Sequence, residues 1–223
     1  MHENTLVLLL AVGTIFNIVW LTIQRNRVHI KNVGTIIISI LHTLIGVGCV
    51  MVFALAEKGF DKSALGNMSL FGGVFFMPLF YYGFAKLTKR NIADVFDVFT
   101  ICIVFTLMCA RVNCMLSGCC QGALINSTGA RWPTREAEVV FYAALLVVLI
   151  GKFKRGAYVR GTLYPLYMLC YGVFRFVCEW FRTAGGGSQL HLAHIWAMIS
   201  AAVGLSVYLE LQNKNNKRKG RTR

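Results

Sequence analysis

The sequence has few charged residues and no long polar stretch of the kind that separates domains. Charged side chains make up 14% of the 223 residues and hydrophobic ones 57%, with a mean hydropathy of +0.61. Soluble domains are nearer about 45–50% apolar, so this composition excludes an ordinary soluble protein and predicts an integral membrane protein. Internal repeats and low-complexity segments are also missing. We expect a single transmembrane helical domain over residues 1–212 and a basic cytoplasmic tail over 213–223.

Acidic residues are scarce, since 9 Asp and Glu stand against 23 Lys and Arg, for a formal net charge of +14. A basic chain can bind nucleic acid, but here the basic residues form short clusters between apolar runs, which argues against that partner. A basic region before the first apolar run is missing, as is a small-residue cleavage site after it. We therefore expect the first apolar run to stay as a helix rather than to be removed as a signal peptide.

Apolar runs of the length that crosses a bilayer, about 17–25 residues, recur along the chain. Backbone groups in lipid must be satisfied within a helix or a closed barrel, and no segment has the pattern of barrel strands. We predict an all-α fold, a seven-transmembrane-helix bundle. The predicted helices cover residues 5–23, 34–56, 67–86, 92–112, 137–151, 160–182 and 190–211.

The basic residues predict an orientation. Sixteen of the 23 Lys and Arg lie in the connections before the second, fourth and sixth predicted helices and in the tail. The positive-inside rule makes these segments cytoplasmic and turns the N-terminus and the other connections outward. The basic residues predicted to lie on the outward side are Lys58, Lys62, Arg111, Arg131, Arg135 and Arg182.

One predicted span contains ionisable residues. Tyr171, Arg175, Glu179 and Arg182 are spaced i, i+4, i+8 and i+11, so they share one helix face. A charge in hydrocarbon costs several kcal/mol unless it is paired or faces a wet cavity, which makes it a functional-site hypothesis. Arg175 and Glu179 are spaced to pair. They either pin two helices together or present a guanidinium to a lipid phosphate, which arginine binds bidentately. Arg182, one turn further on, is predicted to lie near the outer headgroup layer. The alternative explanation is that its side chain only snorkels to the interface.

A second polar stretch begins at Arg111, where a predicted span ends, and continues through Gly118 and Gly122 to Glu138. Glycines allow a backbone to approach a ligand or another helix closely. Glu138 is also explained by its place near a helix start, where the macrodipole favours anions. Both polar stretches fall near the predicted outer face. We therefore expect one lipid-accessible polar cavity toward that face.

Eight cysteines are present, and most lie in apolar runs as small hydrophobic residues. Cys114, Cys119 and Cys120 share one polar segment and leave several interpretations open. These are a disulfide such as Cys114–Cys119 at an outward face, a thiol-redox role for Cys119 and Cys120, inert side chains in a tight turn, or zinc with His191 or His194 as a further ligand. The spacing matches no standard zinc pattern, and we predict neither a metal nor a cofactor.

The two polar stretches resemble motifs of the prolipoprotein diacylglyceryl transferase family. Its Tyr-Gly-x-x-Arg-Phe-x-x-Glu-x-x-Arg motif is matched in full by Tyr171, Gly172, Arg175, Phe176, Glu179 and Arg182. Its Arg-x-Gly-Asn-Phe-x-Asn-Gly-Glu-x-x-Gly signature is matched only at Arg111, Gly118 and Gly122, with Cys114 at the first Asn and Cys119 at the Glu.

Two further motifs resemble the same family. Pro133 and Glu138 match its His-Pro-Ser-Gln-Leu-Tyr-Glu-Ala motif, in which Trp132 takes the place of the histidine. Residues 69–73 resemble its Ser-Phe-His-Gly-Gly motif, with Phe71 at the histidine position. The resemblance covers about residues 65–200.

The resemblance implies seven transmembrane helices in a bacterial cytoplasmic membrane, with the N-terminus outside and the C-terminus cytoplasmic. The implied activity is that of a thioether-forming transferase of lipoprotein biosynthesis. It moves a diacylglyceryl group from phosphatidylglycerol to the thiol of a lipobox cysteine and releases glycerol phosphate. The implied partners are phosphatidylglycerol, a prolipoprotein signal peptide with its lipobox cysteine, and membrane lipid; we expect a monomer. We predict as catalytic residues Arg111, Arg175, Glu179 and Tyr171. We predict as substrate-binding residues Gly72, Gly73, Cys114, Gly118, Gly122, Glu138, Arg182 and His194.

The general base is not evident, because Phe71 and Cys114 stand where the family has histidine and asparagine. His42 and His194 are candidates to replace it, although an intramembrane histidine is more often a hydrogen-bonding residue in packing. Two alternative functions follow. The alternatives to an active transferase are a lipid- or lipopeptide-binding homologue with altered catalysis, and an unrelated small permease or membrane thiol protein.

Overall fold

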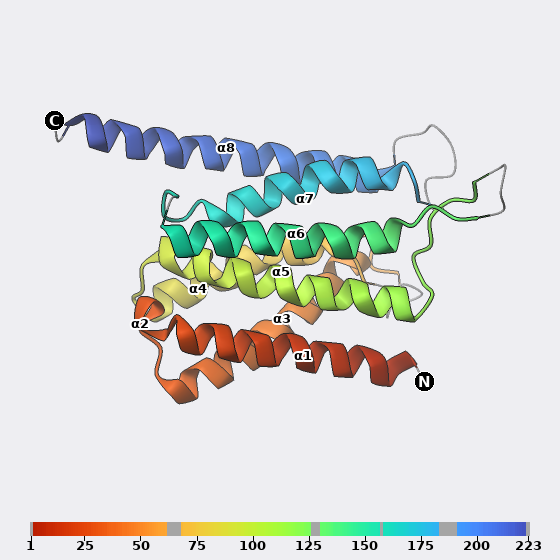
Figure 1. Ribbon diagram of the computed structural model, residues 1–223, viewed down its shortest axis with the longest axis horizontal. Helices are drawn as coiled ribbons and strands as arrows, with labels where there is room; N and C mark the ends of the chain where they lie inside the picture. The colour runs from red at the N-terminus through yellow and green to blue at the C-terminus, as the bar shows by residue number, and fades with distance from the viewer. Residues whose placement is uncertain (1, 62–67, 126–129, 157, 183–190, 222–223) are drawn as a thin grey trace.

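The computed structural model describes residues 2–61, 68–125, 130–156, 158–182 and 191–221 (Figure 1). Within these ranges the chain is helical, and its only β-pairing is two isolated bridges. The all-α prediction is therefore confirmed. The helices of the described residues are α1 (His2–Ile23), α2 (Arg25–Val28), α3 (Asn32–Glu57), α4 (Phe71–Leu87), α5 (Ile92–Leu116), α6 (Thr134–Arg155), α7 (Leu163–Glu179) and α8 (Leu192–Arg221).

Four of these helices are long and apolar enough to cross a membrane. They cover Asn4–Ile23, Asn32–Glu57, Ile92–Leu116 and Leu192–Gly220. Helices α4 and α7 have 17 residues each, which is at the lower limit for a span, and α6 carries charged residues in both its first and last turns. The chain is a multi-pass membrane protein.

The predicted helix ranges overlap the long helices, but several ends were wrong. Helix α5 continues past residue 112 to Leu116, so Cys114 lies inside the helix rather than in a loop, and Arg111 lies more than a turn before the helix end. Helix α6 begins at Thr134 rather than at 137, which places Glu138 beyond the first turn. The helix macrodipole acts mainly within the first turn, so it does not by itself explain a glutamate at position 138.

Two more predicted ends differ from the structure. Helix α7 ends at Glu179 rather than at 182, so Arg182 lies outside the helix that carries the rest of its motif. Helix α8 runs well beyond 211, through most of the predicted basic tail. The short helix α2 was not predicted. The predicted first residues at 67 and 190, and Lys62, lie outside the described residues.

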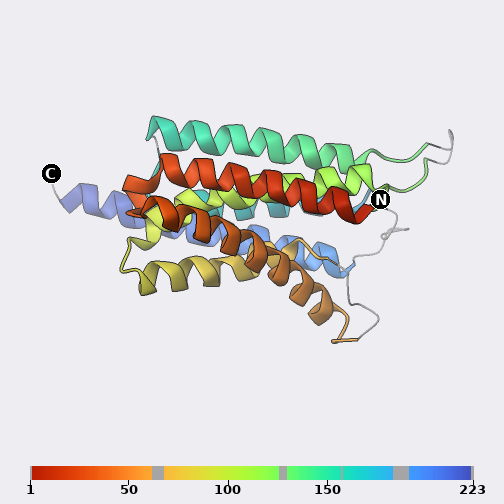
Figure 2. The same ribbon diagram turned by 90° about the horizontal axis from the view of Figure 1, so that it is seen from below.

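Successive long helices run in opposite directions through the bundle (Figure 1). The N-terminus of α1, the end of α5 and the start of α6 lie at one end, which we call the N-end. The C-terminus and the α4–α5 and α6–α7 connections lie at the opposite end, the C-end (Figure 1). The last turns of α8 extend beyond the rest of the bundle there in both views (Figures 1 and 2).

Helix α5 is the centre of the bundle. It packs against α1, α4, α6 and α7, and residues all around it are buried, among them Val98, Ile101 and Cys102. Helix α3 crosses the bundle at an angle to α1 and packs against α4 (Figure 2). The burial of α5 on every side is expected for a mostly apolar helix at the centre of such a bundle.

A buried carboxylate fixes the start of α7 on α5. Asp97 is fully buried. Its Oδ2 accepts a hydrogen bond from the backbone N–H of Gly161 at 2.7 Å, and its Oδ1 accepts one from Leu163 at 3.1 Å. These donors belong to the first turn of α7 and its approach, where N–H groups have no partner within a helix. Arg175 lies twelve residues further along α7, or about 18 Å at 1.5 Å per residue, so this contact helps to set its height in the bundle.

Helices α7 and α8 touch through their backbones. A Cβ added at Gly172 would lie 2.5 Å from the carbonyl oxygen of Ala197 and 2.5 Å from the backbone nitrogen of Ala201. A Cβ at Gly204 of α8 would likewise lie 2.6 Å from the backbone nitrogen of Leu169. Only glycine permits so close an approach. These contacts therefore fix the distance between the axes of α7 and α8.

We expect Gly172→Ala to destabilise the protein by about 1–3 kcal/mol, because the new methyl group meets backbone that has no free rotation. The matched control is Gly151→Ala in α6, where an added Cβ has nothing within 4 Å. In a helix this change is expected to be neutral or to stabilise by about 0.5–1 kcal/mol. Thermal unfolding of both variants in detergent measures the difference. Equal unfolding temperatures would contradict the close contact.

Candidate active site

A buried carboxylate joins arginines from two other helices. Glu138 of α6 pairs through Oε2 with Nε of Arg111 on α5, and its Oε1 accepts a hydrogen bond from Nη1 of Arg175 on α7. The exposed fractions are 4% for Glu138 and 6% for each arginine. Three helices therefore meet at one carboxylate. Arg111 is near the end of α5 and Glu138 near the start of α6, and these two helix ends lie at the N-end of the bundle (Figure 1). The sequence predicted that Arg111 and Arg175 lie close together, and the structure places them on the same partner.

The second half of the Arg175 fork faces Glu179. Nη2 of Arg175 lies 2.8 Å from Oε2 of Glu179, which confirms the pairing expected from their i, i+4 spacing. Nη1 of Arg182 lies 3.6 Å from the same oxygen. Counted over these ion pairs alone, the group holds three arginines and two glutamates, an excess of one positive charge. A buried group with excess positive charge favours an anion as its ligand.

Apart from Nε of Arg111, which is ion-paired with Glu138, three buried donors in this group have no hydrogen-bond partner among the described residues. They are the hydroxyls of Tyr171 and Tyr142 and Nε of Arg175. The two tyrosine rings lie 6.3 Å apart, and both interact electrostatically with Arg111 and Glu138. An unpaired buried polar group costs about 1–3 kcal/mol, so each requires an explanation. A ligand with several acceptor oxygens would satisfy them together.

Two residues of this region were missed by the sequence analysis. Tyr142 lies one turn after Glu138 on α6 and is 1% exposed, so its i, i+4 spacing from a buried glutamate was an available signal. Glu57, the last residue of α3, interacts electrostatically with Arg175 and Glu179. Its place at the end of an apolar helix gave no sequence signal of that contact.

The loop between α5 and α6 folds back over the end of α7. Gly122 forms an isolated antiparallel bridge with Arg182, and the backbone N–H of Ala123 donates to the carbonyl of Phe181 at 2.8 Å. A Cβ at Gly122 would collide with the carbonyl oxygen of Trp132. Gly122 is therefore required by close backbone packing, and that packing holds Arg182 beside the arginine–glutamate group.

The other predicted glycines have structural explanations. Gly72 lies against the carbonyl of Cys49, where any side chain would collide, so it sets the contact between α3 and α4. Gly73 has ordinary packing neighbours. Gly118 has a φ of +70° in the turn after α5, a conformation that favours glycine. A substrate contact at these glycines stays a prediction.

The two candidate histidines have partners elsewhere in the bundle. His42 is 3.0 Å from the hydroxyl of Tyr81 through Nε2 and 3.4 Å from Nδ2 of Asn17 through Nδ1. His194 accepts from the backbone N–H of His191 at 3.2 Å and packs against the ring of Trp180. The contacts of His42 are typical of a histidine that serves packing, whereas Nε2 of the buried His194 has no hydrogen-bond partner among the described residues.

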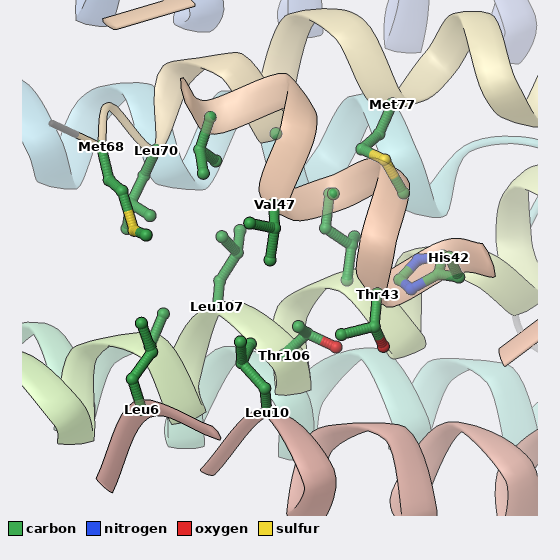
Figure 3. A pocket seen from close by; sticks show the side chains of 15 residues that line it. Leu6, Leu10, His42, Thr43, Val47, Met68, Leu70, Met77, Thr106 and Leu107 are labelled. Atoms are coloured by element: carbon green, nitrogen blue, oxygen red, sulfur yellow. The ribbon is translucent and has the colours of Figure 1, made fainter. Parts of the chain in front are cut away.

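His42 also lines a cavity of about 50 Å³ between α1, α3, α4 and α5 (Figure 3). Leu6, Leu10, Val47 and Leu107 face this space, so it is apolar (Figure 3). The cavity is neither polar nor large enough for a lipid, since ligand pockets are usually about 300–1,000 Å³. The lipid-accessible polar cavity predicted from the sequence stays a prediction.

Phe71 occupies a position beside the site. It is the first residue of α4, is 3% exposed, and its ring lies edge-on to the ring of Tyr171 with centroids 5.6 Å apart. A histidine at this position would place a proton acceptor against the tyrosine. The phenylalanine places an apolar edge there instead.

All eight cysteines are free thiols. The sulfur atoms of Cys114, Cys119 and Cys120 lie within 4.8 Å of one another, and the Cys119 thiol donates to the carbonyl of Cys114 at 3.6 Å. A hydrogen bond from the Cys114 thiol lowers the pKa of Cys120 to about 5, and the charges of Arg182 and Arg111 act in the same direction.

A bundle of membrane helices with a buried arginine–glutamate group at one end is typical of a membrane protein that handles an anionic ligand. Comparison with known families agrees with this class. Residues 4–210 match the family described as prolipoprotein diacylglyceryl transferase. The chain belongs to this family, as its motifs indicated.

Three curated relatives are each named phosphatidylglycerol–prolipoprotein diacylglyceryl transferase. The protein of Aeromonas salmonicida is 28% identical over 140 residues, 58% of this chain and 51% of the relative. That of Coxiella burnetii is 28% identical over 127 residues, 52% of this chain and 49% of the relative. That of Mannheimia succiniciproducens is 30% identical over 127 residues, 52% and 47% of the two chains. The chain spans about half the length of the curated relatives it matches.

Proposed function

We propose that this protein transfers a diacylglyceryl group from phosphatidylglycerol to the thiol of a lipobox cysteine in prolipoproteins. The observation that carries the proposal is the group of Arg111, Arg175 and Glu138 with unpartnered donors beside it. The proposed setting is a seven-span bundle formed by α1 and α3–α8 in the bacterial cytoplasmic membrane. Its N-end faces outward, because the basic clusters lie at the C-end.

The phosphate of the lipid donor fits the donors that the site leaves free. Arg175 turns its two Nη atoms toward Glu138 and Glu179 and keeps Nε without a partner. The hydroxyls of Tyr171 and Tyr142 are also available. A phosphodiester has four oxygens, and its two non-bridging oxygens share one negative charge, so it can accept from these donors and balance the excess positive charge. The two glutamates keep the arginines oriented and prevent them from folding onto each other.

The proposed reaction is a displacement at the glyceryl carbon that carries the phosphate. A sulfur–carbon bond forms to the substrate thiolate, the carbon–oxygen bond breaks, and its electron pair leaves on glycerol phosphate. Charge develops on that phosphate oxygen, where fixed arginines stabilise the transition state. The thiol loses its proton to water before attack. Because a free cysteine has a pKa near about 8.5, the field of Arg111 and Arg175 is sufficient to favour the thiolate without a dedicated base.

A second candidate is a homologue that binds a lipid or lipopeptide without transfer. The contact between Phe71 and Tyr171 favours it, since the family's histidine position holds no proton acceptor. The third reading, an unrelated permease or membrane thiol protein, is removed by the family match.

The decisive experiment is complementation of a bacterium depleted of its own transferase, combined with an assay of the purified protein. The assay uses phosphatidylglycerol and a lipobox peptide, and mass spectrometry detects the diacylglyceryl thioether. We expect growth and modified peptide with the wild-type chain and neither with Arg111→Ala. Binding of phosphatidylglycerol with no modified peptide would replace the proposal with the binding homologue.

We expect the variants His42→Ala, His194→Ala and Cys119→Ser to keep transfer rates close to wild type. The nucleophile arrives on the substrate, and both histidines have partners outside the arginine–glutamate group. Initial rates at saturating peptide provide the measurement, with unfolding temperature as the check on folding. A folded histidine variant without activity would identify that residue as the base and reject the field-only account. An inactive Cys119→Ser would point to a mechanism that uses the protein's own thiol.

A further inference from the structure

The last turn of α5 and the turn that follows it bring three thiols together. Cys114 lies on α5, and Cys119 and Cys120 lie just beyond its end. Their sulfur atoms are all within 4.8 Å of one another. Three thiolates around one tetrahedral ion, with metal–sulfur bonds of about 2.3 Å, have sulfur atoms about 3.8 Å apart. A shift of about 1 Å or less would therefore complete a three-sulfur site.

The backbone holds this arrangement in an uncommon conformation. Gly118 has a φ of +70° and Cys120 a φ of +55°. The left-handed conformation costs a non-glycine residue about 1–3 kcal/mol and persists where its surroundings impose it, often at functional sites. Here the turn brings two adjacent cysteines within reach of Cys114. A relaxed turn at Cys120 would separate them.

Charge and access suit a metal ion at this place. Cys119 and Cys120 are exposed and Cys114 is half-buried, so an ion can enter and a water can take the fourth position. Arg111 and Arg182 both interact electrostatically with Cys120. Three thiolates around a divalent ion leave one net negative charge, which is attracted to these nearby arginines. The proposed transfer reaction does not use these thiols, because its nucleophile comes with the substrate.

We propose that Cys114, Cys119 and Cys120 form a three-thiolate site for a thiophilic divalent cation such as zinc. The sequence analysis expected no metal, because the Cys-x-x-x-x-Cys-Cys spacing matches no standard zinc pattern. The spacing becomes suitable only through the turn after α5. A bound ion joins that turn to the end of α5. It thereby stabilises the start of the segment that reaches Gly122 and its bridge to Arg182.

The test is titration of the full chain, purified in detergent and reduced, with cadmium ion as a spectroscopic probe. Thiolate-to-cadmium charge transfer gives an ultraviolet absorption band, and zinc is then added in competition. We expect one cadmium per chain, displacement by zinc, and a rise in unfolding temperature, because the ion binds the folded state. Each of Cys114→Ser, Cys119→Ser and Cys120→Ser should weaken cadmium binding by at least about tenfold, since one of three metal–sulfur bonds is lost.

The matched control is Cys170→Ser, a half-buried thiol on α7 away from the group, which should bind cadmium like the wild type. Unchanged binding in both Cys119→Ser and Cys120→Ser would overturn the proposal. So would a wild-type chain that binds no cadmium while its thiols remain reactive. A disulfide between two of the three cysteines in protein isolated without reductant would also overturn it, because the ligands would then be consumed.

Discussion

Arg175→Lys should lose most of the transfer activity although it keeps the positive charge. The guanidinium reaches Glu138 on α6 through Nη1 and Glu179 on α7 through Nη2. A lysine has one nitrogen on a flexible stem and cannot hold both carboxylates while it meets a phosphate. Removing one fixed donor from a site of developing charge costs about 10²–10³ in kcat. We expect a loss in that range with phosphatidylglycerol as donor.

The rate of thioether formation by the purified variant provides the measurement, and Arg135→Lys is the matched control. Arg135 lies in the first turn of α6 and pairs only loosely with Glu136, at 3.6 Å. It should tolerate the change. Near-normal turnover by Arg175→Lys would reject the bidentate role and leave Arg175 as a simple point charge.

Glu138→Gln should have the largest effect on stability. The carboxylate compensates two buried arginines, and its neutral replacement leaves Arg111 and Arg175 facing each other. Breaking a buried ion pair by removing one partner costs about 3–5 kcal/mol. We therefore expect a large fall in unfolding temperature together with the loss of transfer activity.

Glu136→Gln is the control for this change, two residues away on the same helix. Its side chain is 45% exposed, and an exposed ion pair contributes about 0–1 kcal/mol. Thermal unfolding in detergent compares the two variants. A Glu138→Gln protein as stable as Glu136→Gln would show that the arginines do not depend on this carboxylate. Its site would then need another source of negative charge.

The sequence predicted approximately where the long helices lie, although not their ends, and that Arg111 and Arg175 come close together. Apolar runs set where a span must lie, and the i, i+4 spacing of Arg175 and Glu179 is a geometric statement about one helix. The grouping of Arg111 with Arg175 was predicted because charged side chains within a membrane must be paired or face the interior of the bundle.

What the sequence did not predict depends on contacts between segments. Glu138 had a sufficient local explanation as a residue near a helix start, and only the assembled bundle shows it between two arginines. The sequence spacing placed Arg182 on the same helix as Arg175, but α7 ends at Glu179 and Arg182 is positioned by its bridge to Gly122. Cys114 is brought close to Cys119 and Cys120 by a turn with left-handed residues, and the sequence does not predict the left-handed conformation of Cys120. In each case the deciding partner lies on another element.

The glycine contact between α7 and α8 bears on how variation in this chain should be read. Arg175 lies three residues after Gly172, about 4.5 Å along the helix. Any group that lifts α7 off Ala197 and Ala201 would therefore move the guanidinium relative to Glu138 on α6. Inactivating alleles are then expected at Gly172 and Gly204 in chains whose charged residues are all intact. A survey of natural or selected variants that scored only arginines and glutamates would overlook the positions that aim them.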